Sequence, residues 1–193
     1  MGWRETIGSV GAALGWWRPT DQAVGCRVGQ EVYREAKRAA AIANVQRRPQ
    51  TPGPRLRALI TELFPDLDVG ALRYRTGCRL PPNHFRDDGW VLAMTFGSTV
   101  FWRGDLDEDD PRDVVNFLHE VVHADQVRRY GGEAGFACEY GKGYVEGGGQ
   151  LPARITEPTR YHRNPLEAEA YSFEARFQDG RGRVIPGSIP WPA

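Results

Sequence analysis

Residues 111–129 read PRDVVNFLHEVVHADQVRR, and this stretch predicts the longest helix of the chain. Pro111 suits a first helical position, because its φ angle is already helical and its missing N–H is not needed there. The apolar residues that follow recur with a helical period. Gly131 and Gly132 follow Arg128 and Arg129 after one intervening residue, which is typical of a helix end. We therefore expect a helix from Pro111 to about residue 129, with its apolar side buried.

This helix contains an HExxH motif formed by His119, Glu120 and His123. Residues i and i+4 lie on the same face of a helix, so both imidazoles can bind one zinc ion while Glu120 lies beside it. The apolar neighbours would surround the ion with a low-dielectric environment. The motif therefore predicts a zinc site in which Glu120 accepts a proton from the water that the ion activates.

A third protein ligand must come from another part of the chain, because catalytic zinc sites usually have three. The extended metzincin motif fails, since Gln126 and Arg129 occupy the positions that it reserves for glycine and histidine. A second helix is predicted from Pro165 to about Phe177, with Asn164 as its N-cap. This helix is rich in glutamate, so we expect a glutamate ligand.

Three glutamates of this second helix are candidates. We favour Glu167 because Ala170, three positions further on the same face, would let the two helices approach closely. Glu169 is the competing ligand. We expect Glu174 to be an exposed carboxylate, and its alternative role is a hydrogen bond to a ligand imidazole.

Composition and charge restrict the class of protein. The 193 residues contain 25 basic and 25 acidic side chains, and this balance does not favour nucleic-acid binding. No stretch approaches the roughly 20 apolar residues of a membrane span, and residues 7–17 lack the features of a signal peptide. We expect a cytoplasmic location by default, with export by a dedicated machine as the alternative.

The cysteines are three in number, Cys26, Cys78 and Cys138. They are widely spaced and form no CxxC pair, and an odd number does not indicate a disulfide framework. We therefore expect free thiols, most of them buried.

The remaining pattern predicts an α+β protein. Strand-like runs on either side of Gly97 and Ser98 predict a hairpin within a small antiparallel sheet. Further helices are expected at residues 3–18, 30–46, 55–63 and 133–144, and strands at 71–76, 90–96 and 99–103. We divide the chain into a helical N-terminal appendage with a linker at 1–54, a main domain at 55–178 and a Gly/Pro-rich extension at 179–193.

Four blocks of this sequence resemble motifs of the DUF4157 metallopeptidase family, and the similarity spans about residues 55–177. The blocks are DVGALR at 68–73, AMTFGSTVF at 93–101, FLHEVVHADQ at 117–126 and NPLEAEAY at 164–171. The resemblance implies a zincin-like domain of a kind found near polymorphic toxins and contractile injection systems. Similarity to the ligand helix of gluzincins supports Glu167 as the third ligand, although Tyr171 stands where that pattern has aspartate.

These observations predict a zinc-dependent peptide hydrolase with His119, His123 and Glu167 as metal ligands and Glu120 as general base. Tyr161, or else His162, is the candidate donor to the transition-state oxyanion. The strand at 99–103 is expected to form a sheet edge that accepts an extended peptide substrate. The alternative function is a non-catalytic zinc-binding module that docks with a secretion or injection apparatus.

Overall fold

The computed structural model describes residues 22–80, 91–146 and 164–192. Within these ranges the protein is α+β, with five helices and one three-stranded mixed sheet. The helices are α2 (Gln22–Ala43), α3 (Pro54–Leu63), α4 (Pro111–Arg129), α5 (Glu133–Glu146) and α7 (Pro165–Glu174), and a short 3₁₀ turn, η1 (Ala175–Phe177), follows the last of them. The strands are β1 (Arg73–Arg75), β2 (Ala93–Phe96) and β3 (Thr99–Trp102). None of the helices in these ranges is long and apolar enough to cross a membrane.

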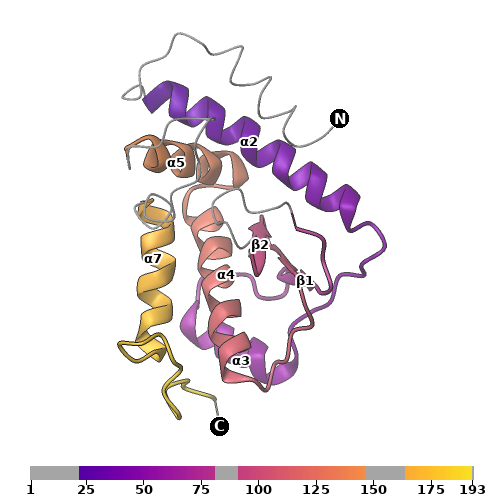
Figure 1. The fold of residues 1–193 in the computed structure, drawn as a ribbon, viewed down its shortest axis with the longest axis vertical. Helices are drawn as coiled ribbons and strands as arrows, with labels where there is room; N and C mark the ends of the chain where they lie inside the picture. The colour runs from indigo at the N-terminus through magenta and orange to yellow at the C-terminus, as the bar shows by residue number, and fades with distance from the viewer. Residues whose placement is uncertain (1–21, 81–90, 147–163, 193) are drawn as a thin grey trace.

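Helix α4 is the centre of the fold, and it forms over the predicted residues. The side chain of Asp110 caps it by accepting a hydrogen bond of 2.8 Å from the N–H of Arg112, and Pro111 occupies the first turn. Helix α7 packs along α4, and the sheet and α3 contact its other sides (Figure 1). The main hydrophobic core lies between these elements and includes Leu118 and Val121, both without exposed surface.

The sheet contains the predicted hairpin but is not entirely antiparallel. Gly97 adopts a φ of 62°, in the left-handed region, at the turn between β2 and β3. Strand β1, however, pairs with β3 in parallel, and the strand order is β1-β3-β2. The expectation of an antiparallel sheet is therefore wrong for β1. The long connection from residue 76 to residue 92 leaves the direction of β1 free, whereas a two-residue turn forces only its own two strands to be antiparallel.

The strand order also shows that the strand expected at the sheet edge, β3, is not an edge strand. Strand β3 is central, with Val100, Phe101 and Trp102 all buried, so residues 99–103 cannot be an edge. A continuous apolar run is typical of a strand that is covered on both faces. Strand β2 is an edge of the described sheet, and it contacts α4.

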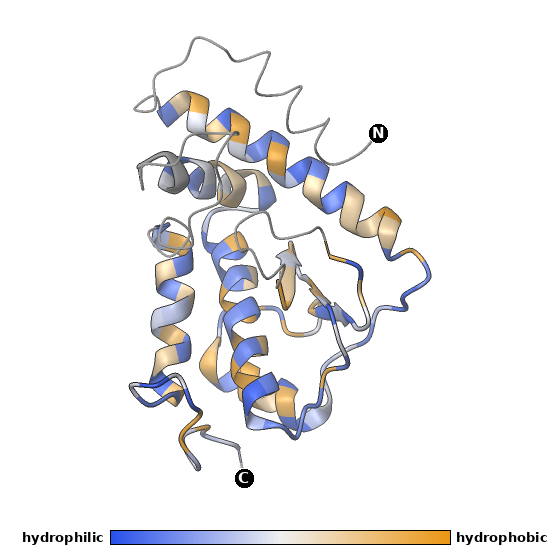
Figure 2. Cartoon of the chain, in the orientation of Figure 1, coloured by the Kyte–Doolittle hydropathy of each residue, from blue (hydrophilic) through white to orange (hydrophobic). Residues whose placement is uncertain are grey.

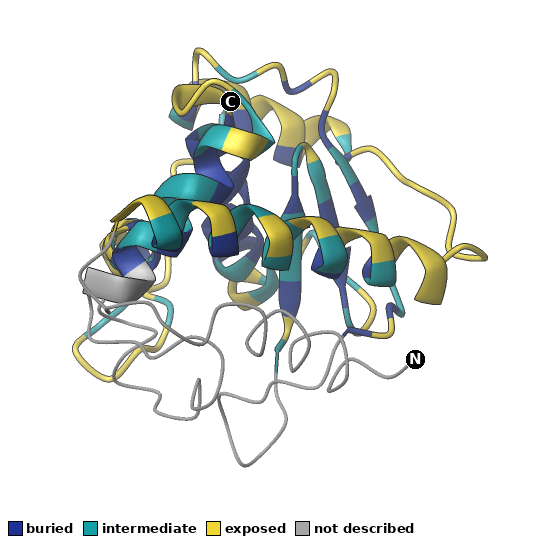
Figure 3. Cartoon of the chain, turned by 90° about the horizontal axis from the view of Figure 1, so that it is seen from above, coloured by how far each residue is buried: buried dark blue, intermediate teal, exposed yellow. Residues whose placement is uncertain are grey.

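Helix α2 begins and ends earlier than predicted and lies across α5 (Figure 1). Hydrophilic and hydrophobic residues alternate along it, and buried residues recur along its length (Figures 2 and 3). The buried residues Val28, Ala36 and Ala40 have the spacing of one helix face. Part of this side contacts the sheet through a second core cluster that includes Phe96 and Phe101.

Glycines bring α2 and α5 into close contact. A Cβ at Gly141 would lie 2.1 Å from the carbonyl oxygen of Gly25, and a Cβ at Gly29 would lie 2.2 Å from that of Ala137. Any larger side chain at these positions would therefore push the helices apart.

A disulfide joins the same two helices, between Cys26 and Cys138, while Cys78 is a buried free thiol. The expectation of free thiols is therefore wrong for two of the three cysteines. The two partners are 112 residues apart in sequence, and only the packing of α2 on α5 brings them together.

Helices α3, α5 and α7 occupy the positions expected of them, with ends that shift by a few residues. The expected helix at 3–18 lies outside the described residues. In the C-terminal segment, Ile189 is buried in the main core and the guanidinium of Arg55 lies 3.8 Å from the ring centroid of Trp191.

Candidate metal centre

Two imidazoles of α4 lie one helical turn apart on its buried side. His119 and His123 have only 7% and 6% of their surface exposed, and their ring centroids are 5.1 Å apart. The i, i+4 spacing accounts for this arrangement, because it places both rings on one helix face. The core contacts of α4 hold that face toward α7.

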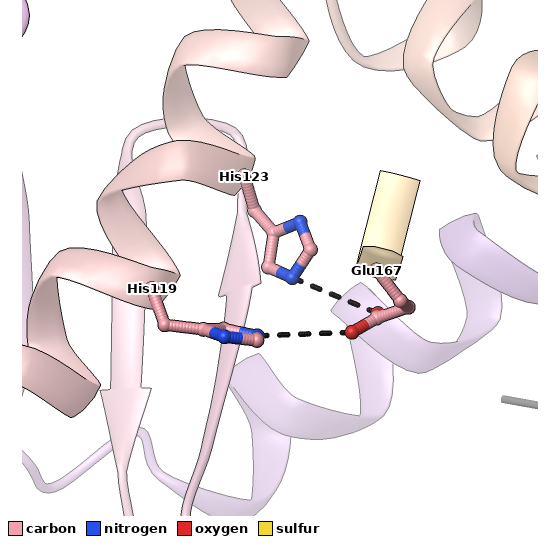
Figure 4. Close-up of side chains that lie close together, drawn as sticks. All are labelled: His119, His123 and Glu167. Carbon is pink, nitrogen blue, oxygen red and sulfur yellow. Dashed lines mark ion pairs between the residues drawn. The ribbon is translucent and has the colours of Figure 1, made fainter. Parts of the chain in front are cut away.

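Glu167 approaches both imidazoles from α7. Asn164 caps this helix by accepting a hydrogen bond from the N–H of Leu166, so Glu167 lies in its first turn. Its Oε1 lies 3.6 Å from Nε2 of His123, and its Oε2 lies 3.7 Å from Nε2 of His119 (Figure 4). The carboxylate is thus directed at the same nitrogen atom of each ring.

These three side chains can hold a metal ion. One ligand atom from each of His119, His123 and Glu167 lies within 4.8 Å of the others, and all three residues are buried. Oε2 of Glu167 is buried and has no hydrogen-bond partner. A buried carboxylate oxygen without a partner is costly, and a cation between the three side chains would remove that cost. Two imidazoles and a carboxylate are also a ligand set that catalytic zinc sites use.

The charges of the three residues are strongly coupled. Burial alone would lower the pKa of His119, but Glu167 and Glu174 raise it to about 10. The pKa of His123 is also raised, because the negative charge of Glu167 outweighs the effect of burial. Burial opposes the ionisation of Glu167, yet the charges of the two histidines bring its pKa well below the usual range. The ionised carboxylate of Glu167 therefore favours protonation of both imidazoles when no metal is bound.

Each of the three side chains is also bound by a neighbour. Oε2 of Glu174 lies 3.2 Å from Nδ1 of His119, and Oε1 of Gln126 lies 2.8 Å from Nδ1 of His123. The hydroxyl of Tyr140, on α5, donates a hydrogen bond of 2.7 Å to Oε1 of Glu167. Such neighbours orient metal ligands, and metal affinity depends on them.

Glu120 lies beside the three side chains and is bound to the sheet. It is 8% exposed, and its charge contributes to the raised pKa values of both histidines. Its Oε2 accepts a hydrogen bond of 2.6 Å from the hydroxyl of Thr95, on β2. The general base predicted from the motif therefore connects α4 to the edge strand.

The other residues that the sequence predicted for the site are Glu169, Glu174, Tyr161 and His162. Glu169 is directed elsewhere and pairs with Arg129 and with Gln126. Glu174 has only 14% of its side chain exposed and contacts Nδ1 of His119, so our expectation of an exposed carboxylate is wrong and the contact with an imidazole is the alternative that we named. Tyr161 and His162 lie outside the described residues.

Sequence reasoning missed two of the residues that contact the candidate metal ligands. Gln126 is three positions after His123, and the i, i+3 spacing on a helix could have identified it. Tyr140 has no such signal, because only the packing of α5 near α7 brings it to Glu167.

Comparisons with protein-family models, with curated proteins and with solved structures found no match to this chain.

Proposed function

We propose that this protein is a zinc-dependent hydrolase that cleaves peptide bonds. The observation that carries the proposal is the buried group of His119, His123 and Glu167, with an unpartnered Glu167 oxygen directed into it. The placement of Glu120 next to this group adds a residue type that hydrolytic zinc sites require. The resemblance of the sequence to DUF4157 metallopeptidases supports the same reaction.

The number of ligands favours a catalytic ion over a structural one. Structural zinc sites have four protein ligands, whereas catalytic sites have three and leave one position open. The part of the chain that the structure describes supplies three. When bound there, zinc would supply Lewis acidity and lower the pKa of a coordinated water.

Glu120 would perform the proton transfers. Its carboxylate accepts a proton from the attacking water and then gives it to the amine of the departing peptide fragment. The hydrogen bond from Thr95 to Oε2 holds the carboxylate in one orientation during both transfers. A rigid base loses less entropy when the reacting groups come together.

Strand β2 is the element that we propose binds the substrate. In an antiparallel hairpin every second residue directs its N–H and C=O away from the partner strand. Arg103 N–H donates to the carbonyl of Leu92, and the pairs Met94 with Phe101 and Phe96 with Thr99 continue this bonded series. The backbone groups of Ala93 and Thr95 therefore face the sheet edge, where an extended peptide can add as a further strand.

A non-catalytic metal module is the second candidate function, and the burial of the ligands favours it. His119, His123 and Glu167 are each less than 10% exposed, as in a site that only stabilises a fold. In this case the partner would be a component of a toxin-delivery or injection apparatus, as the family resemblance suggests.

Cleavage of a peptide library by the purified protein distinguishes the two functions. With one equivalent of zinc we expect cleavage that stops when the metal is chelated. Glu120→Gln should keep its zinc and lose activity by about 10²- to 10⁴-fold, which is the usual contribution of a general base. Glu62→Gln, at an exposed position of α3, is the matched control and should cleave normally. Zinc binding without any cleavage would favour the non-catalytic module, and full activity of Glu120→Gln would contradict the proposed mechanism.

A further inference from the structure

Gln126 is fully buried beside the proposed zinc site, with none of its surface exposed. It lies one turn after His123 on α4, and its Oε1 is 2.8 Å from Nδ1 of that imidazole. Its Nε2 donates two further hydrogen bonds across to α7. One, of 2.9 Å, goes to the carbonyl oxygen of Leu166, and the other, of 3.0 Å, goes to Oε2 of Glu169.

These two α7 acceptors determine which way the amide of Gln126 points. A backbone carbonyl has no hydrogen, and the carboxylate of Glu169, which pairs with Arg129, is likewise an acceptor. If the amide were turned over, its oxygen would face two acceptors in a buried place and both hydrogen bonds would be lost. Leaving buried polar groups unpaired in this way is costly. Oε1 must therefore face His123.

The orientation of the amide determines the tautomer of His123. An amide oxygen accepts hydrogen bonds and cannot donate them, so Nδ1 of His123 must carry a hydrogen. An imidazole must be neutral to bind a metal, and a neutral imidazole has only one N–H, which leaves the lone pair on Nε2. Nε2 is the atom that faces Glu167 Oε1, at 3.6 Å.

We propose that Gln126 is a positioning residue, which holds His123 in the tautomer whose Nε2 binds the metal. The proposal rests on the proposed function, since it concerns the same ion. Because the amide is neutral, it orients the ring without adding negative charge to a site that already contains Glu120, Glu167 and Glu174. His119 differs in this respect, because its Nδ1 faces the carboxylate of Glu174.

Nitrogen-15 NMR of the zinc-loaded protein tests the tautomer directly. In the wild type we expect the proton of His123 on Nδ1, protected from exchange by Gln126, and the metal-induced shift on Nε2. In Gln126→Met, a change of similar volume, the protected proton of His123 should be lost. That of His119 should remain, because its contact with Glu174 is intact. A role confined to stabilising the fold would not produce this selective change.

Zinc affinity, measured by competition with a chelator, is the second readout. Gln126→Met should bind zinc about 10- to 100-fold more weakly, the usual effect of losing such a partner. Arg128→Met is the matched control, because Arg128 pairs with Asp66 and Asp125 and its removal leaves the contact of Gln126 with His123 unchanged; it should bind as the wild type does.

Zinc on Nδ1 of His123 in the wild type would overturn the proposal, as would unchanged affinity in Gln126→Met. If Gln126→Met does not fold, the NMR assignment of the zinc-bound nitrogen of His123 in the wild type tests the proposal by itself. A wild type that binds no zinc would overturn the proposed function as well, so the two failures are distinguishable.

Discussion

The hydroxyl of Tyr140 donates a hydrogen bond of 2.7 Å to Oε1 of Glu167. Tyr140 belongs to α5 and Glu167 to α7, so the bond links two helices at the carboxylate of the candidate metal centre. Cys138 lies two residues before Tyr140 on α5 and forms the disulfide with Cys26 of α2. The candidate metal centre is therefore connected to α2 through α5.

Removal of this hydroxyl should weaken zinc binding. Tyr140→Phe leaves the ring in place but removes the hydrogen bond that orients Glu167, and we expect a loss of about tenfold in zinc affinity. Chelator competition measures the change. Tyr130→Phe, at a residue that is 39% exposed, is the control, and equal affinities for the two variants would rule out a role for Tyr140.

The identity of the third ligand can be tested with two glutamates of one helix. Glu167→Gln should abolish stoichiometric zinc binding, because it removes the negative charge directed at both imidazoles. Glu169→Gln should retain the zinc, since that carboxylate pairs with Arg129. Metal analysis of the dialysed variants gives the answer, and the reverse pattern would make Glu169 the ligand.

Zinc affinity should rise with pH. The pKa of His119 in the metal-free protein is raised from 6.5 to about 10, so zinc must displace a proton at neutral pH. Each displaced proton makes the apparent affinity rise about tenfold per pH unit. Titration calorimetry at pH 6 to 7.5, in buffers of different ionisation enthalpy, measures both the affinity and the released protons. A zinc affinity that does not depend on pH would show that zinc binding displaces no proton, and would contradict this prediction.

The raised pKa of His119 also predicts how the effect of zinc on thermal stability depends on pH. A raised pKa of His119 stabilises the metal-free fold fully below pH 6.5, and this contribution is lost as pH rises through about 10. Stabilisation by bound zinc depends on pH in the opposite direction, because zinc affinity rises with pH. The difference in Tm between zinc-loaded and metal-free protein should therefore widen from pH 6 to pH 8, and a difference that narrows would contradict the sign.

Reduction of the disulfide should destabilise the protein. The bond between Cys26 and Cys138 closes a loop of 112 residues, and removing a native disulfide typically costs about 2–5 kcal/mol. Denaturant unfolding with and without reductant measures the loss. The double variant Cys26→Ser, Cys138→Ser is the control, because its stability should not respond to reductant.

This bond also bears on where the protein works. Disulfides persist mainly in oxidising compartments, so we predict that this bond forms in such a compartment, as export by a dedicated machine would allow. Thiol labelling of the protein taken directly from its cells tests the inference. Labelling of Cys26 without prior reduction would contradict it.

Local pattern was enough to predict α4 and its histidines. A period of 3.6 residues per turn places His119 and His123 on one face whatever surrounds the helix, and Pro111 marks its beginning. The hairpin at Gly97 was predictable for the same reason, since a two-residue turn constrains only the residues next to it.

Contacts between distant segments could not be read from such patterns. Glu167 and Glu169 are two positions apart in one helix, which directs their side chains to nearly opposite sides. The sequence by itself determined that a glutamate of this helix was available, and the packing of α7 on α4 decided that Glu167 is the one directed at the histidines. The direction of β1, the disulfide and the hydrogen bond from Tyr140 were decided in the same way. Spacing along a helix is a property of the local backbone, whereas the choice among side chains depends on which surfaces the whole chain buries together.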